Sequence, residues 1–330
     1  NPSSSRSCRF KSGPGHHLKK GNMHNCIDGQ IWEGRVDNPD IHERVGQIVK
    51  CQTQNKVLNF NENSIALLGF CCDLGVSRNE GRSGARHAPN KIRQYLKSLP
   101  LNKILDLYDH GNIDVDDDLN AGQGALANFI SKSVLSNSKA IVLGGGHETA
   151  WGIAKGLYSC FDDLAIINID AHFDLRATDN KNKASSGTPF YQAHQWCLEQ
   201  NKPFNYSCIG IGEHSNTKTL FNYANKAQVD FLLDSDCCDV KNIDKFLDRK
   251  IFSAKNIYLT VCMDAVNAAY APGVSAPNTS GLLPEHIIHT VQKILKSKKV
   301  VVVDLVEVNP KYDLNDMTSR LAGKIVWEYL

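Results

Sequence analysis

Three side chains with metal-binding chemistry stand at alternate positions near the middle of the chain. Asp170, His172 and Asp174 come directly after the apolar run of residues 164–169. Side chains in extended backbone alternate between two faces, so these three project to the same side, about 6 to 7 Å apart. Carboxylates with an imidazole suit a hard or borderline divalent cation such as manganese, with zinc as the competitor. The pattern alone is equally compatible with a helix-capping aspartate and a histidine satisfied within a loop.

Further candidate ligands follow other apolar runs. His147 comes after three glycines, residues 144–146, which let the backbone turn tightly. Asp264 ends another apolar run, with Cys262 two residues before it on the same face, and Glu307 lies beyond a fourth run. Each of these residues, taken singly, is more often a cap or loop residue than a ligand. Together they gather several acids and two histidines at strand ends, and like charges buried together need a cation.

The elements that would position these residues alternate along the chain. Apolar runs of the length of buried parallel strands are each followed by turn residues and a helix-like segment. The expected strands are residues 65–70, 140–143, 164–169, 206–211, 257–263 and 300–305, and the expected helices are residues 89–99, 122–135, 149–159, 189–199, 217–226, 284–296 and 318–329. This alternation predicts an α/β fold of three αβα layers with a central parallel sheet. Open sheets of this kind bind ligands at the carboxyl ends of their strands, where the candidate ligands lie.

The composition is that of an ordinary globular protein, for which one large α/β domain is favoured over two small ones. Lys and Arg total 37 against 35 for Asp and Glu, so we expect no nucleic-acid groove and no membrane-surface helix. No apolar run approaches the roughly 18 to 20 residues needed to cross a bilayer. The 11 cysteines are an odd number in a chain without a secretory signal, which favours reduced thiols in the cytoplasm.

The first 22 residues are rich in Ser, Gly and basic side chains. We expect them to be a disordered tail or a remnant of cloning, with a transit peptide as the alternative. Residues 23–330 are then expected to form a single domain.

Several longer motifs make the chain similar to the ureohydrolase superfamily, which includes arginase, agmatinase and formimidoylglutamase. The resemblance runs from about Trp32 to the C-terminus and is closest to the formimidoylglutamase branch. The motifs are GVSRNEGR at residues 75–82, GGGHETAWG at 144–152, SGTPF at 186–190, SNT at 215–217, APGVSAP at 271–277 and EVNP at 307–310. Ser186 stands where agmatinases carry a histidine, and formimidoylglutamases typically have serine there. We therefore include Ser186 among the expected substrate-binding residues.

The resemblance implies an arginase-like fold and hydrolysis of N-formimino-L-glutamate to L-glutamate and formamide, a step of histidine degradation, with two Mn²⁺. Carried over to this sequence, one ion would be held by His147, Asp170 and Asp174, and the other by Asp170, His172 and Asp264. Related enzymes commonly form trimers or hexamers, so a homo-oligomer is expected by analogy.

Cys262 departs from the family pattern, which has an acid at this position that bridges the two ions. A thiolate offers one soft sulfur atom, which manganese prefers less than a carboxylate. The metal site is therefore weakened, shifted toward zinc, half-occupied or empty. Two alternatives stay open: a homologue with impaired catalysis, and a hydrolase of another guanidino or amidino substrate such as agmatine.

The resemblance also suggests roles in the reaction. Water activated by the cations would attack the formimino carbon, Glu307 would pair with the cationic amidine, and Asp174 would pass a proton to the departing amine. The two carboxylates of the glutamate half need guanidinium partners, and Arg78, Arg82 and Arg86 are the candidates. Each of the three is otherwise an ordinary ion-pair residue, and we expect only one of them to serve.

Overall fold

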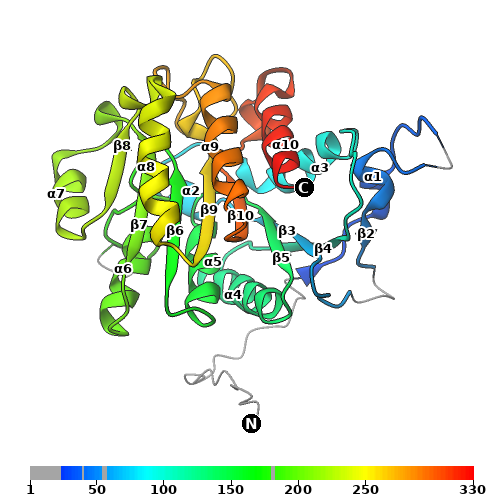
Figure 1. The fold of residues 1–330 in the computed structure, drawn as a ribbon, viewed down its shortest axis with the longest axis horizontal. Coiled ribbons are helices and arrows are strands. Elements are labelled where there is room, and N and C mark those ends of the chain that lie inside the picture. The colour runs from blue at the N-terminus through cyan, green and yellow to red at the C-terminus, as the bar shows by residue number, and fades with distance from the viewer. Residues whose placement is uncertain (1–23, 39–40, 54–57, 180–182) are drawn as a thin grey trace, which may run out of the picture.

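The computed structural model describes residues 24–38, 41–53, 58–179 and 183–330. Its strands are β1 (His24–Asn25), β2 (Lys50–Cys51), β3 (Ile65–Cys71), β4 (Leu107–Asp114), β5 (Lys139–Leu143), β6 (Leu164–Ile169), β7 (Asn205–Ile211), β8 (Asp230–Leu233), β9 (Asn256–Cys262) and β10 (Val300–Val306). Within the described residues they form one sheet in the order β1-β4-β3-β5-β10-β9-β6-β7-β8, with β2 also paired to β4 (Figure 1). All of these pairs are parallel except β1 with β4.

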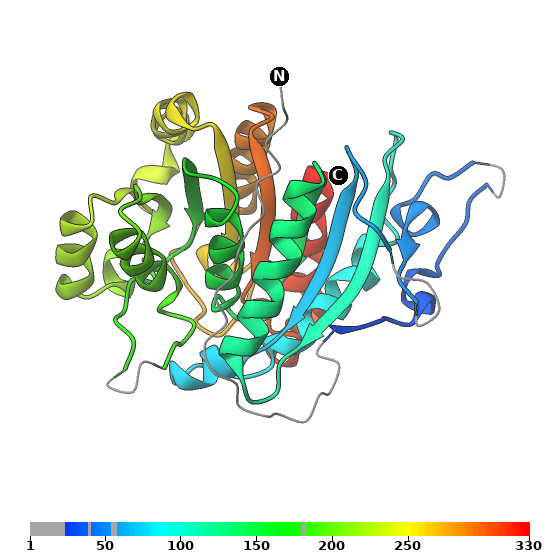
Figure 2. The ribbon, with the colours of Figure 1, turned by 90° about the horizontal axis from the view of Figure 1, so that it is seen from below.

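Helices cover both faces of this sheet. They are α1 (Val45–Ile48), α2 (Leu74–Arg78), α3 (Ala88–Leu96), α4 (Leu119–Leu135), α5 (Thr149–Tyr158), α6 (Pro189–Glu199), α7 (Lys218–Lys226), α8 (Val240–Ser253), α9 (Pro284–Lys296) and α10 (Met317–Tyr329). Apolar side chains of α3, α8, α9 and α10 pack into one core, and those of α4, α5, α6 and α7 pack into a second core across the sheet. The ribbons show helices on both sides of the sheet (Figures 1 and 2). The predicted three-layer αβα architecture is confirmed.

Strand β3 illustrates why the sequences of the central strands are continuous apolar runs. Ile65 and Leu67 point into the core that includes Ile92 of α3, whereas Ala66 and Leu68 point into the opposite core. Successive side chains alternate between the faces, and helices cover both faces, so every position of the strand must be apolar.

The starts of several helices follow from local sequence. Pro189 and Pro284 occupy the first turns of α6 and α9, where a missing backbone N–H costs nothing. Asp118 caps α4 by accepting a hydrogen bond from the Ala121 N–H at 2.9 Å. These helices therefore begin where the turns after the preceding strands end.

All six strands expected from the sequence are present, as β3, β5, β6, β7, β9 and β10. The strand expected to reach residue 263 ends at Cys262, and the short 3₁₀ helix Met263–Ala265 then carries Asp264. Strands β4 and β8 and helix α8 were not predicted.

The expectation for residues 1–22 lies outside the described residues. Since one sheet connects the described parts of the chain, we propose that residues 23–330 form a single domain. No helix in the described ranges has both the length and the apolar character needed to span a membrane.

Candidate metal centre

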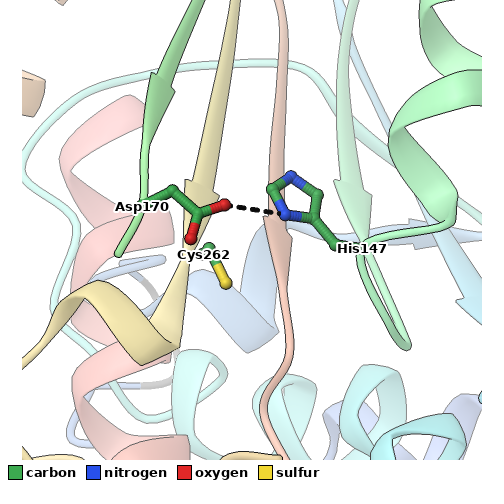
Figure 3. Close-up of side chains that lie close together, drawn as sticks. All are labelled: His147, Asp170 and Cys262. Atoms are coloured by element: carbon green, nitrogen blue, oxygen red, sulfur yellow. Dashed lines mark ion pairs between the residues drawn. The ribbon is translucent and has the colours of Figure 1, made fainter. Parts of the chain in front are cut away.

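The candidate ligands converge because their four strands are neighbours. The sheet runs β5-β10-β9-β6, so the carboxyl ends of these strands lie side by side. His147 follows β5, Asp170 follows β6, Cys262 ends β9 and Glu307 follows β10. In the close-up the His147 imidazole and the Asp170 carboxylate face each other, with the sulfur of Cys262 beside them (Figure 3). Residues that are up to 160 positions apart in sequence thus share one site.

The glycines before His147 serve close packing. A Cβ atom on Gly145 would lie 1.7 Å from the Cys72 carbonyl oxygen, and one on Gly146 would lie 2.1 Å from a Glu148 carboxylate oxygen. Neither glycine has a positive φ. A tight turn was expected from these glycines, but what requires them is the close approach of neighbouring atoms.

His147 is fixed by hydrogen bonds on two sides. Its backbone N–H donates to Glu307 Oε1 at 2.8 Å, and its Nε2 lies 3.0 Å from the Thr260 hydroxyl. The remaining ring nitrogen, Nδ1, lies 3.0 Å from Asp170 Oδ2 and 2.8 Å from Asp174 Oδ2. This nitrogen is buried and makes no hydrogen bond with the described residues. A buried imidazole nitrogen that stands beside two carboxylates without hydrogen-bond geometry is suited to bind a cation together with them.

The donor atoms form two groups of three. One group contains His147, Asp170 and Cys262, and the other contains Asp170, His172 and Asp264; the donor atoms within each group lie within 4.8 Å of one another. Asp170 belongs to both groups, as a bridging carboxylate would. In the second group His172 Nδ1 lies 3.2 Å from Asp264 Oδ2 and 3.6 Å from Asp170 Oδ1.

Asp174 and Cys262, which the resemblance places beside the ions, stay predictions as ligands. Asp174 is adjacent to His147 but belongs to neither group of three, whereas Cys262 takes the third position beside His147 and Asp170. The donor set of nitrogen, carboxylate oxygen and one sulfur fits divalent transition-metal ions.

Electrostatics also favour a cation at this site. Burial and then the Asp170 carboxylate raise the pKa values of Asp174 and Asp264. Burial and then the Glu148 carboxylate raise the pKa of Glu307 well above its ordinary value. Each of these acids is held among other acids with little access to water, and a positive ion would relieve both costs.

A cavity of about 190 Å³ opens onto the cluster. His147, His172, Asp174, Asp264 and Glu307 line it, and Ser186 does as well. The role of Ser186 in substrate binding stays a prediction, and its place in the cavity wall is compatible with it.

The three arginines expected to bind the substrate do not line this cavity. Arg78 and Arg82 donate to backbone carbonyl oxygens, each at 3.1 Å, and Arg86 forms an ion pair with Asp116 at 2.7 Å. Each guanidinium is engaged elsewhere by the fold. Their role in substrate binding stays a prediction, which the cavity lining does not favour.

Arg176 lines the cavity instead, and the sequence reasoning missed it. It is the only Arg or Lys among the described residues of the lining, and its exposed guanidinium has no partner in the described part of the chain. Its backbone N–H donates to the Gly187 carbonyl at 2.9 Å, which joins it to the loop that carries Ser186. The available signal was its position two residues after Asp174, at the same strand end.

Comparison with known proteins gives the family. The model of the arginase family matches residues 63–330. The chain belongs to the arginase family. A formimidoylglutamase of Vibrio cholerae is 39% identical over 320 residues, covering 92% of this chain and 95% of the relative. A formimidoylglutamase of Legionella pneumophila is 37% identical over 303 residues, covering 91% and 95%.

Solved structures support the arginase-family fold. A formimidoylglutamase of Bacillus subtilis superposes with a TM-score of 0.77 at 24% identity, covering 90% of this chain and 93% of that one. A formiminoglutamase of Trypanosoma cruzi, solved with Mn²⁺, gives 0.74 at 23% identity, covering 81% and 92%. At these identities the likeness concerns the fold.

Proposed function

We propose that this arginase-family chain hydrolyses N-formimino-L-glutamate to L-glutamate and formamide with two bound Mn²⁺. The observation that carries the proposal is the pair of three-donor groups sharing Asp170, beside a cavity that also presents Glu307 and Arg176. The formimidoylglutamases that match over nine-tenths of the chain support the choice of substrate.

The metal-binding roles follow from the donor groups. Asp170, His172 and Asp264 would hold one ion. Asp170 and His147 would hold the other, and Asp174 lies beside His147. When bound, divalent ions lower the pKa of coordinated water and polarise the carbon that is attacked.

Glu307 is suited to bind the cationic amidine. Its Oε1 accepts the His147 N–H, while its Oε2 is buried without a partner in the described residues. Since burial and Glu148 raise the pKa of Glu307, a cationic partner is needed to favour the charged carboxylate. An amidinium at Oε2 would satisfy that oxygen and orient the carbon for attack. Asp174, at the cavity wall beside His147, would accept a proton and deliver it to the departing nitrogen.

Arg176 is suited to bind a carboxylate of the glutamate half. A guanidinium binds a carboxylate through two parallel hydrogen bonds, and this one has no competing partner in the described residues. Agmatine carries a cation in place of these carboxylates, so Arg176 would repel it. The cavity therefore favours an amidine that ends in carboxylates.

We extend the proposal to a cytoplasmic, homo-oligomeric enzyme. Cys197, Cys208 and Cys262 are buried free thiols, which suits a reducing compartment. By family analogy the oligomer is a trimer or hexamer, which the sedimentation of the purified chain would test.

The test is a formamide-release assay on the metal-free chain reloaded with Mn²⁺. We expect release from N-formimino-L-glutamate that depends on Mn²⁺ and is lost in Asp170→Asn, with arginine and agmatine hydrolysed more slowly. Preferential hydrolysis of agmatine would overturn the choice of substrate. Loss of catalysis would be indicated if the parent neither bound Mn²⁺ nor released formamide, while Cys262→Asp did both.

A further inference from the structure

Cys262 lies at the centre of the candidate metal site. It is the last residue of β9, its side chain is buried, and its sulfur lies within 4.8 Å of donor atoms of His147 and Asp170 (Figure 3). The thiol donates a hydrogen bond to Asp264 Oδ1, with a sulfur-to-oxygen distance of 2.9 Å. The sulfur therefore belongs to one donor group and contacts the other.

The two donor groups differ in chemical softness because of this sulfur. His147, Asp170 and Cys262 offer nitrogen, oxygen and sulfur, whereas the group of His172 and Asp264 with Asp170 offers one nitrogen and carboxylate oxygens. Thiolates and imidazoles favour zinc and cobalt, and carboxylates favour manganese. Three protein ligands with a fourth position left open is the usual arrangement of a catalytic zinc ion.

A second observation indicates a cation in the sulfur-containing group. His147 Nδ1 is buried beside the Asp170 carboxylate, yet it makes no hydrogen bond with the described residues. Buried polar atoms normally make well-oriented hydrogen bonds. This nitrogen instead meets carboxylate oxygens of Asp170 at 3.0 Å and Asp174 at 2.8 Å without hydrogen-bond geometry, as groups that share a cation would. The same cation would contact the nitrogen, the carboxylate and the sulfur.

We propose that Cys262 is itself a metal ligand and makes the two positions unequal. The position formed by His147, Asp170 and Cys262 takes Zn²⁺ or another thiol-binding divalent ion, and the position formed by Asp170, His172 and Asp264 takes Mn²⁺. The thiol proton leaves to solvent when the metal–sulfur bond forms. This inference rests on the proposed two-metal function and specifies which metal each position prefers. Mn²⁺ fills both positions when it is the only divalent ion supplied, and Zn²⁺ displaces it from the sulfur-containing position when both ions are present.

The competing state is a thiol that stays protonated and only fills space. Burial and then Asp170 raise the pKa of the Cys262 thiol in the metal-free protein, and its hydrogen bond to Asp264 would persist. In that state no bound metal ion would have a sulfur neighbour.

The test is zinc-edge X-ray absorption on the metal-free full-length chain, given one equivalent of Zn²⁺ and then excess Mn²⁺, because Zn²⁺ in excess would outcompete Mn²⁺ at both positions. We expect one zinc and one manganese per chain, with a sulfur atom about 2.3 Å from zinc. Cobalt supplied alone, at one equivalent, should give a thiolate-to-cobalt charge-transfer absorption. Formamide release, measured on the same samples, reports on the proposed function separately.

Two variants and a control isolate the sulfur. Cys262→Asp and Cys262→Ser should lose the zinc–sulfur signal and the cobalt band. Cys262→Asp should bind two Mn²⁺ when Mn²⁺ is the only divalent ion supplied. Cys238→Ser, which removes an exposed thiol, should leave both signals and the activity unchanged. Circular dichroism of each variant checks that it is folded.

The outcomes separate the two proposals. Two bound metals without a sulfur neighbour would overturn the role of Cys262 and leave the proposed function standing. A sulfur signal that survives in Cys262→Ser would assign zinc to another cysteine and overturn the inference as well. If no metal bound at all, the proposed two-metal function would also fail.

Discussion

At the scale of single residues, Glu307 is held in a backbone conformation that side chains seldom adopt. Its φ is 66°, its N–H donates to the Gly145 carbonyl at 2.8 Å, and its carboxylate accepts the His147 N–H at 2.8 Å. Unusual backbone of this kind persists only where surrounding contacts enforce it, and it is common at functional sites. The backbone thus aims a single carboxylate oxygen at the cavity.

We predict that Glu307→Gln lowers kcat/KM for N-formimino-L-glutamate by roughly 100-fold, since a neutral amide cannot pair with a developing cationic amidine. Steady-state formamide release would measure the effect. Glu285→Gln, an exposed acid on α9, is the matched control and should leave the rate unchanged. Equal rates for Glu307→Gln and the parent would remove Glu307 from the reaction.

We predict that Arg176→Ala raises KM for the same substrate by roughly 10- to 100-fold with a smaller change in kcat, because it removes a charge-assisted contact remote from the reacting carbon. Arg176→Lys should recover only part of the loss, since lysine keeps the charge without the planar fork. Arg86→Ala, which breaks the ion pair with Asp116, should leave KM unchanged. An effect on KM from Arg86 and none from Arg176 would restore the original expectation.

The arginines show why residue types and motifs reach only part of the site. The candidate ligands could be found from sequence because each follows an apolar run that becomes a strand. The direction of an arginine is set by distant partners: the Arg82 guanidinium lies 4.4 Å from the Tyr312 ring, and Arg82 donates to the Ser275 carbonyl. A local sequence pattern cannot predict contacts between residues that are 193 positions apart in the sequence, as Arg82 and Ser275 are.

At the scale of elements, β4 was missed because polar residues interrupt it. Asp109, His110 and Asn112 are buried within this strand, and a buried strand was expected to be apolar. Arg93 of α3 satisfies Asp109 in a bidentate ion pair, with Nε to Oδ2 at 2.8 Å and Nη2 to Oδ1 at 2.9 Å. Helix α8 did carry a usable signal, since Ile243, Phe246 and Leu247 repeat at helical spacing and are all buried.

We predict that Arg93→Ala lowers the free energy of unfolding by about 3 to 5 kcal/mol, because it leaves the fully buried Asp109 charge without its partner. Denaturant titration followed by circular dichroism measures the change. Arg86→Ala, at an exposed pair, should cost roughly 0 to 1 kcal/mol. Similar losses in the two variants would contradict this assignment.

His110 in β4 should make stability depend on pH. Burial lowers the pKa of His110 from the ordinary 6.5 to about 4, so the unfolded chain binds a proton at a pH where the folded chain does not. Stability is therefore lost as pH falls from 6.5 to 4, by about 3 kcal/mol in all.

The loss of stability at low pH should be smaller in His110→Phe. The rings of His110 and Phe60 are stacked with centroids 4.8 Å apart, and the substitution keeps an aromatic ring at this position. Denaturant titrations at pH 6.5 and pH 4.5 measure the loss. His87 is exposed, so the control His87→Gln should lose as much stability at low pH as the parent does. If His110→Phe showed the same pH dependence as the parent, His110 would be ruled out as its source.

At the scale of the whole molecule, the metal centre ties together strands from distant parts of the chain. Its ligands run from His147 to Asp264, and Glu307 approaches from β10. The acids of the cluster are buried close together, so removing cations leaves their repulsion uncompensated. Metal content should therefore affect the stability of the entire fold as well as catalysis.

We predict that chelation lowers the thermal midpoint and that Mn²⁺ restores it. Each ion at 100 times its Kd contributes about 2.7 kcal/mol to the folded state. Scanning calorimetry with and without chelator measures the shift, and Asp170→Asn, which alters the shared ligand, should show a much smaller one. A midpoint that is independent of Mn²⁺ in the parent would argue against any metal in the fold.

The most direct measurement is anomalous X-ray diffraction at the manganese edge, from crystals grown with Mn²⁺ as the only divalent cation. We expect two peaks on either side of the Asp170 carboxylate, one toward His147 and the other toward His172 and Asp264. Absence of both peaks, or peaks bound elsewhere on the molecule, would contradict this expectation.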